Sequence, residues 1–301
     1  MNKDAGTLFY DAPGRTAVVL LVRFGEIALK SPYVRRQLRD RLVANIQDLF
    51  AAGRVECLTR ADHSRIYIEV NDVSAATRIL RRAFGVVSFS PAEPCPPKLE
   101  SIAGVAAGVA RDRVHAGTTF AIRARRSGSH TFTSQEVARV AGAEIQRAIP
   151  GAVVDLDEPQ VEVFVEVRDG TGYVFTDIVP GPGGLPLGSQ GSALAVVEGA
   201  RGVVAAWMAM KRGCKLTIAA PTEELADPLR RWDVHLKVLA YRPGDDLVAI
   251  LRIARARAVF LGTSIDDLLS TRMDLPVPVF HATIGLGDDE VAVRMRSIVA
   301  A

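Results

Sequence analysis

The chain has 301 residues, which is enough for two or three domains with their own apolar cores. Its hydrophobic content of 49% and charged content of 24% are typical of a globular protein, and no apolar run approaches the roughly 20 residues that span a bilayer. The formal net charge is only +3, so the composition does not predict a uniformly basic surface.

The amino terminus MNKDAGTLFYDAPGR has neither a basic nor an apolar signal region, so we expect no signal peptide and no membrane partner. The three cysteines, Cys57, Cys95 and Cys214, stand far apart and lack metal-ligand spacing. This pattern fits a reducing compartment, and we expect a cytoplasmic protein.

Alternating strands and helices are predicted for the first ninety residues. Ser31 is a candidate N-cap, because Pro32 follows it at the first helical position. The expected elements are a strand over 18–23, a helix over 32–49, a strand over 65–70, a helix over 74–84 and a strand over 86–90. Two βαβ-like units of this size predict a ferredoxin-like α+β domain over 1–90.

The segment PAEPCPPK, 91–98, contains four prolines and predicts an irregular linker at a domain boundary. The elements expected after it are a helix over 99–113, a strand over 119–125, a helix over 134–149 capped by Ser134, and a hairpin of strands 161–167 and 173–178 across Asp169-Gly170. We expect this second domain to cover 91–182, with a flexible joint at 180–191.

The remaining segment, 183–301, alternates short apolar strands with helices. Strands are expected over 194–197, 215–219, 236–241, 258–262 and 277–280, which is the pattern of a parallel α/β sheet. A glycine-containing turn joins the first of these strands to a helix over 203–211, the geometry that cradles a phosphate. At about 110 residues the domain is short for a full nucleotide-binding sheet.

Arginines gather in two places along the chain. One cluster comprises Arg35, Arg36, Arg39 and Arg41, and the other comprises Arg123, Arg125 and Arg126. Either cluster alone is most simply a solvated face. Two clusters flanking one module favour nucleic-acid binding, because the arginine fork donates bidentately to phosphate.

Four segments closely resemble the tRNA 4-thiouridine sulfurtransferase family, also called ThiI. They are VRFGEIALKS (22–31), FGVVSFSPA (84–92), RARRSGSHTFTSQEVARVAG (123–142) and GPGGLPLGSQG (181–191), and the likeness is weaker after residue 191. The resemblance implies a ferredoxin-like domain, a THUMP RNA-binding domain and a Rossmann-like pyrophosphatase-loop domain. In that family the first two domains hold the acceptor stem of tRNA, and the third adenylates a uridine that then receives sulfur from a cysteine persulfide.

The resemblance also implies an RNA-binding surface. Its candidate residues are Lys30, Arg35, Arg36, Arg123, Arg125, Arg126, Ser127, Ser129, His130 and Arg139. Independently of the family, arginines at a strand end, a Gly128 loop with hydroxyls and a capped helix can donate to phosphates or 2′-hydroxyls. The alternative is an ordinary polar loop.

The nucleotide loop departs from the family pattern Ser-Gly-Gly-x-Asp-Ser. The matching residues are Glu198, Gly199, Ala200, Arg201 and Gly202, which lack both serines and the aspartate. Glu198 would repel a triphosphate. Arg201 can hold a phosphate, but more simply Glu198 beside it forms a local salt bridge or a capping contact.

No catalytic residue is predicted, since no cysteine follows Cys214 to carry sulfur. The acidic pairs 245–246, 266–267 and 288–289 recur at predicted helix starts, where they complement the helix dipole, so no metal site is predicted. The first hypothesis is therefore a tRNA-binding protein without activity of its own, acting as a homodimer or beside a partner modification enzyme, with no cofactor. The second is an active tRNA thiolation enzyme that uses ATP, Mg²⁺ and an external sulfur carrier, and the third is a scaffold that only dimerises.

Overall fold

The computed structural model describes residues 18–25, 31–168, 170–270 and 275–300. These residues form two compact units. The first contains the described residues up to Val22 together with Tyr67–Val73 and Phe89–Val179, and the second contains Arg23–Ile66, Ser74–Ser88 and Pro180–Ala301. The domain boundaries at 90 and 182 stay predictions.

The order of elements in the first part of the chain is that of a ferredoxin-like domain followed by a second α+β module. The elements are β1 (Val18–Phe24), α1 (Pro32–Ala52), β2 (Cys57–Ala61), β3 (Ile66–Val70), α2 (Val73–Leu80), β4 (Val86–Cys95), α3 (Leu99–Ala110), β5 (Thr119–Ser127), α4 (Ser134–Ala148), β6 (Val153–Val154), β7 (Val161–Arg168), β8 (Thr171–Phe175) and β9 (Val179–Pro180). The predicted cap of α1 is confirmed, since the Ser31 side chain accepts from the N–H of Val34. Strand β2 was missed by the sequence analysis.

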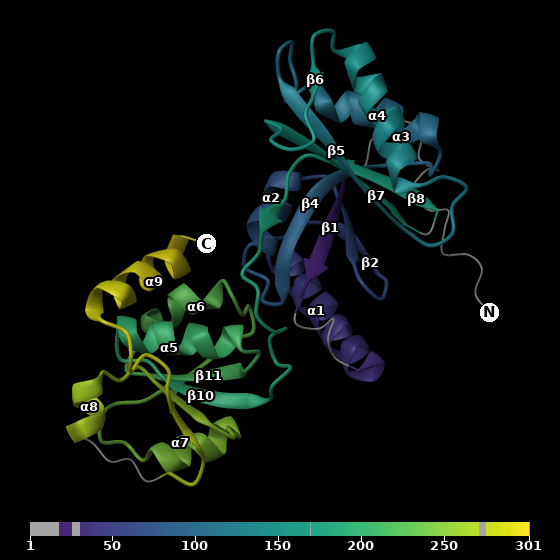
Figure 1. The fold of residues 1–301 in the computed structure, drawn as a ribbon. Coiled ribbons are helices and arrows are strands. Elements are labelled where there is room, and N and C mark those ends of the chain that lie inside the picture. The colour runs from purple at the N-terminus through teal and green to yellow at the C-terminus, as the bar shows by residue number, and fades with distance from the viewer. Residues whose placement is uncertain (1–17, 26–30, 169, 271–274, 301) are drawn as a thin grey trace. The chain divides into compact units, whose positions relative to one another are not determined.

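Strands β1 to β9 form one nine-stranded sheet with the order β2-β3-β1-β4-β8-β7-β5-β6, and β9 pairs with β4. Helices α3 and α4 pack side by side on one face of β5, β7 and β8 (Figure 1). The core between them is built from alternate residues of the strands, such as Phe120, Ile122 and Val163, and from Ala106 and Val137 of the helices.

The linker predicted at 91–98 is wrong, because β4 continues through Pro91 and Pro94 to Cys95. Pro94 lies opposite Tyr173 in the antiparallel pairing of β4 with β8. Proline is compatible with extended backbone wherever the ladder needs no N–H from that residue. The four prolines therefore mark one long strand that ends at a turn, and not a flexible joint.

The second unit contains a five-stranded sheet with the order β12-β11-β10-β13-β14. All four pairings are parallel, as predicted. Its elements are β10 (Ser192–Val196), α5 (Ala200–Lys211), β11 (Lys215–Ala220), the 3₁₀ helix η2 (Glu223–Ala226), α6 (Asp227–Arg230), β12 (Lys237–Ala240), α7 (Leu247–Ala254), β13 (Val259–Leu261), α8 (Ile265–Ser270), β14 (Val279–His281) and α9 (Asp288–Ala300).

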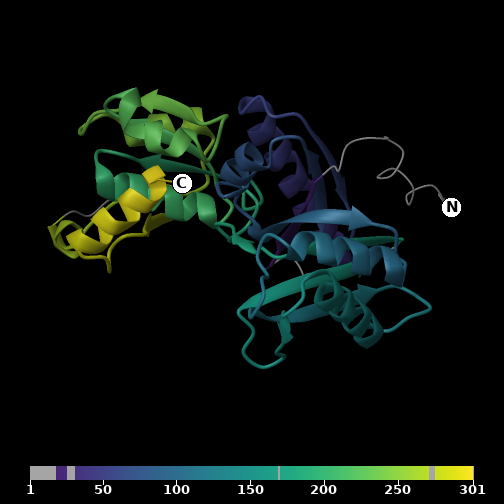
Figure 2. The ribbon, with the colours of Figure 1, turned by 90° about the horizontal axis from the view of Figure 1, so that it is seen from above.

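Helices cover both faces of this parallel sheet, which confirms the Rossmann-like fold class. Helix α9 lies against α5, as both views show (Figures 1 and 2), and its Val291 and Ile298 join the core on that side of the sheet. Leu247 and Leu251 of α7 belong to the apolar cluster on the other side. The centre of the strand order is β10, so the loop after it lies beside the end of β13, where doubly wound sheets bind ligands.

Candidate nucleic-acid interface and nucleotide loop

Strand β5 carries the arginine cluster of the first unit on two opposite faces of the sheet. Side chains alternate along a strand, and Phe120, Ile122 and Ala124 all join the core beneath α3 and α4. Arg126 lies two residues after Ala124, so its side chain is on the same, helix-covered face of the sheet, where it is exposed at the edge of the core. Arg123 and Arg125 belong to the opposite set. The three arginines therefore cannot form one continuous patch.

Arg123 is held by acceptors of its own protein. Its Nε donates to Glu162 Oε1 at 2.6 Å, and its Nη2 donates to the carbonyl of Leu156 at 3.1 Å. The pair joins β5 to β7 and fixes the loop after β6. Arg125 and Arg126, in contrast, are exposed and form no salt bridge among the residues that the structure describes.

The loop between β5 and α4 is ordered by local contacts. Gly128 has a φ of +90°, in the left-handed region that glycine adopts without strain. His130 stacks on the buried ring of Phe132, with 5.5 Å between centroids, and its Nε2 lies 2.9 Å from the Ser127 carbonyl oxygen. Ser129 is exposed at the tip.

Helix α4 begins with a capping box in which Thr133, and not the predicted Ser134, is the N-cap. The N–H of Thr133 donates to Glu136 Oε2 at 2.7 Å, and the N–H of Glu136 donates to Thr133 Oγ1 at 3.1 Å. These bonds lower the pKa of Glu136, and the charges of Arg139 and Arg126 lower it further. Arg126 and Arg139 are therefore both close enough to Glu136, at the helix start, to act on its charge, and both are exposed.

The remaining candidate residues come from the start of α1. Lys30 lies outside the described residues. Arg36 is exposed in the first turn, whereas Arg35 is half-buried and engaged in contacts of its own. Both belong to the second unit, and the RNA-contacting role of all the candidate residues stays a prediction.

The nucleotide loop connects β10 to α5 with extended backbone. Gly199, the N-cap, has a φ of 175° and offers no side chain to the helix start. A Cβ on Gly262 at the end of β13 would meet the Gly202 nitrogen at 2.3 Å, so the backbones of β13 and α5 touch. This close approach requires glycine at 262, which the sequence analysis did not single out.

Arg201 does not pair with Glu198, contrary to the simpler of the two predicted roles. Its Nη1 donates to the carbonyls of Thr283 at 3.2 Å and Leu286 at 2.9 Å, and its Nη2 pairs with Asp288 at 2.6 Å. The side chain is 17% exposed. The guanidinium therefore joins the start of α5 to the turn before α9, and both of its terminal nitrogens are engaged by the protein.

Glu198 is exposed at the carboxyl edge of the sheet. Burial raises the pKa of Tyr241, which directly follows β12, and the charges of Glu198 and Asp245 raise it further. These two carboxylates therefore make the edge unfavourable for a polyphosphate.

Hydroxyl groups lie further along this edge, on residues that the sequence analysis missed. Thr263 Oγ1 lies 2.7 Å from His281 Nδ1, and Thr283 Oγ1 donates to the Thr263 carbonyl at 3.1 Å. Both threonines lie in segments that resemble the ThiI family only loosely, FLGTSIDDLLS (260–270) and LPVPVFHATIGLGDDEV (275–291), and their contact was missed because the segments are far apart in sequence. The described residues contain no group of side chains suited to a metal ion, and none of their helices is long and apolar enough to cross a membrane.

Two family models match the first part of the chain. Residues 19–90 match the ThiI ferredoxin-like domain, and residues 97–177 match the THUMP domain. The chain belongs to the ThiI family. The resemblance noted in the sequence is thereby confirmed.

Proteins of the ThiI family from archaea are similar over most of this chain. A probable tRNA sulfurtransferase of Methanothermobacter thermautotrophicus is 40% identical over 208 residues, covering 66% of this chain and 51% of that protein. A tRNA sulfurtransferase of Pyrobaculum aerophilum is 31% identical, covering 93% of this chain and 66% of that protein. The chain thus spans about half of the first relative's length and about two thirds of the second's.

Two solved structures share the fold. PH1313 from Pyrococcus horikoshii has a TM-score of 0.82 at 25% identity, over 93% of this chain and 99% of its own. A 4-thiouridine synthetase in complex with RNA and ATP has a TM-score of 0.80 at 20% identity, over 94% of this chain and 85% of its own. The second likeness concerns the fold alone.

Proposed function

We propose that this protein binds the acceptor-stem region of tRNA through its THUMP domain and has no adenylation or sulfur-transfer activity of its own. The observation that carries the binding part is that Arg126 and Arg139 are exposed near the start of the capped helix α4, with Arg125 exposed on the opposite face of the sheet, and that all three are free of salt bridges among the described residues. Arginines of this kind donate to phosphate oxygens without a desolvated carboxylate competing for them.

Within this surface the helix side contributes more than the opposite face. Arg126 and the exposed tip at Ser129 precede α4, and Arg139 lies in its second turn. Arg123 has a positioning role, because its donors hold Glu162 and the loop carbonyl of Leu156.

Two residues of the nucleotide loop oppose the binding of ATP that adenylation needs. Glu198 places a carboxylate where the family has a hydroxyl donor, and Arg201 is engaged with Thr283, Leu286 and Asp288. ATP bound at this loop would have to overcome repulsion by the Glu198 carboxylate. It would also have to displace Arg201 from its contacts with the protein. We therefore propose that ATP and Mg²⁺ are not cofactors of this chain, and that it works as a homodimer or beside a catalytic partner enzyme.

The alternative is an active tRNA thiolation enzyme with an altered loop and an external sulfur carrier. The observation that favours it is the complete parallel sheet, in which α5 still begins at the centre of the strand order. In such an enzyme the half-buried hydroxyl of Thr263 would have to replace the missing serines as a donor, since Thr283 is fully buried and its hydroxyl donates to the Thr263 carbonyl.

A gel-shift titration of tRNA across a salt series, with and without ATP, separates the two functions. The proposal expects tight binding that weakens steeply with salt and is indifferent to ATP, because counterion release dominates the affinity. Replacing Arg125, Arg126 and Arg139 together by alanine should weaken that binding. Unchanged affinity of this triple variant at moderate salt would refute the RNA surface, and adenylated tRNA in the reaction would establish the enzyme.

A further inference from the structure

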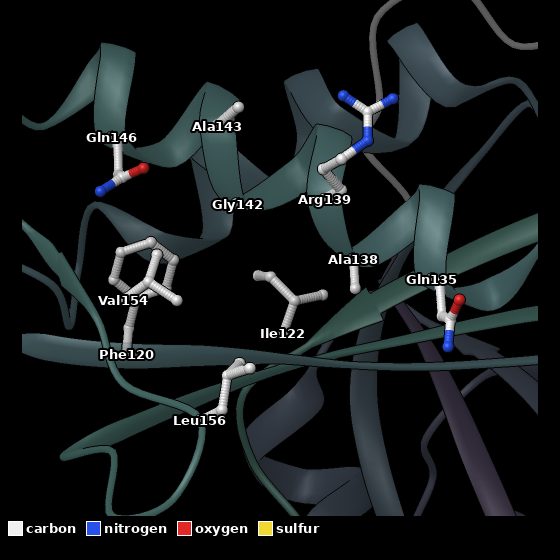
Figure 3. A pocket seen from close by; sticks show the side chains of 10 residues that line it. All are labelled: Phe120, Ile122, Gln135, Ala138, Arg139, Gly142, Ala143, Gln146, Val154 and Leu156. Carbon is white, nitrogen blue, oxygen red and sulfur yellow. The ribbon is translucent and has the colours of Figure 1, made fainter.

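An open apolar groove runs along α4 on the outer side of the THUMP module (Figure 3). Its volume is about 480 Å³. Phe120 and Ile122 of β5 form the floor, the helix supplies one wall, and Val154 and Leu156 at the sheet edge supply the other.

The helical wall is lined by small residues at helical spacing. Ala138, Gly142 and Ala143 face the groove, between Gln135 at one end and Gln146 at the other. A Cβ on Gly142 would meet only Ile122 Cγ1, at 3.8 Å, so a larger side chain is sterically permitted there. The groove can therefore hold additional atoms beside Gly142 without disturbing the packing of the module.

The outer wall leaves apolar surface in contact with water. Val154 is 43% exposed and Leu156 is 62% exposed, next to each other at the end of the sheet. Contiguous exposed apolar side chains beside a hollow are typical of an interaction site, because their burial by a ligand is favourable.

The charges beside the groove favour one kind of occupant. Asp157 and Glu158 are exposed on the loop that carries Leu156, and Asp155 accepts the N–H groups of both. This carboxylate rim repels phosphates, so it disfavours a nucleic acid. A cation on the ligand would be attracted there. Among the described residues that line the groove, Arg139 on the opposite wall is the one cation.

We propose that this groove binds an amphipathic helical segment of a partner protein, with large apolar side chains on one face and lysine or arginine on the flank next to Asp157 and Glu158. The groove follows α4 from Gln135 to Gln146, about 16 Å or three helical turns. A partner helix of that length presents apolar side chains at positions i, i+4 and i+7 to such a groove. The groove shares Arg139 with the proposed RNA surface, but the apolar floor and the acidic rim that carry this proposal contain none of the other RNA-surface residues, and the argument does not depend on RNA binding.

The test uses the full chain and a synthetic peptide of about three to four turns, with leucines at i, i+4 and i+7 and lysines on one flank. Binding is followed by NMR of the Ile122 methyl group, assigned with the variant I122V. We expect the peptide to shift this signal saturably, and a peptide with glutamate in place of lysine to bind about tenfold more weakly at low salt.

Two adjacent valines provide a matched control. Val153 is 50% exposed but does not line the groove, whereas Val154 lines it. V154E and L156E should weaken peptide binding about tenfold or more, and V153E should leave it within about twofold of the wild type. All three positions are exposed, and circular dichroism checks that the variants fold.

Several results would overturn the proposal. The first is no shift of the Ile122 methyl signal by either peptide up to about millimolar concentration, the weak end of measurable affinity. The second is equal loss of binding in V153E and V154E. The third is a shift produced by a short single-stranded RNA and not by the peptide, which would make the groove part of the RNA surface.

Discussion

Arg201 offers the sharpest test of how the altered nucleotide loop works. The variant R201A removes the two hydrogen bonds to the carbonyls of Thr283 and Leu286 and the ion pair with Asp288. Hydrogen bonds from a charged donor contribute about 1.5–3 kcal/mol each, and the carbonyls left behind lose their partner. The ion pair adds little, because the Asp288 side chain is 98% exposed.

We therefore expect R201A to lower the free energy of unfolding of the second unit by about 3 kcal/mol, somewhat less than two full bonds because the guanidinium is 17% exposed. For a unit of this size that corresponds to a fall in melting temperature of about 6–12 °C. The control D288A should cost less than about 1 kcal/mol, since it removes only the exposed partner and a helix-dipole contact.

Differential scanning calorimetry of the three proteins measures these shifts, and calorimetric titration with ATP accompanies it. If Arg201 joins α5 to the turn before α9, R201A melts early and ATP binding is negligible in all three proteins. The reasoning would be refuted if R201A melted like the wild type and lost a measurable affinity for ATP, because Arg201 would then be a phosphate ligand.

Three further predictions concern the RNA surface and the titrating groups. Arg126→Ala should lower the slope of log affinity against log salt by about 1, whereas Arg123→Ala should change that slope little, as measured by gel shift with tRNA. Glu136 has a lowered pKa in the folded protein, so its stabilising contribution is present above its unfolded pKa near 4.5 and is lost as the pH falls through the folded value. The stability of E136Q should therefore fall less than that of the wild type as the pH is lowered, as measured by acid unfolding. Equal loss of stability in E136Q and the wild type would contradict this role of Glu136. In E198Q the pKa of Tyr241 should fall but stay above its ordinary value, because burial is the larger cause; phenolate absorbance against pH measures it.

Local patterns in the sequence determined most of the element order. Apolar residues at helical spacing and the Ser31-Pro32 start identified α1, and alternation with an Asp-Gly turn identified the hairpin of β7 and β8. The prediction that acidic pairs lie at helix starts was also correct: Asp246, for example, is the N-cap of α7. These features depend on neighbours within a few residues, so the sequence alone contains the information.

Pro91 and Pro94 show where local reading fails. Proline is a strong signal for irregular structure, but whether it breaks a strand depends on whether the ladder needs its N–H. That is decided by the register with β8, whose residues lie some eighty positions further along the chain.

The candidate sites depended on tertiary structure even more. The sequence identified the arginines, but their partners decide their roles: Glu162 is 39 residues from Arg123, and Asp288 is 87 residues from Arg201. The groove beside α4 has no motif at all, since its walls meet only when β5, β6 and α4 are assembled. Sequence by itself fixes which side chains are available and which local elements form. The contacts between distant segments decide which donors remain free to bind a ligand.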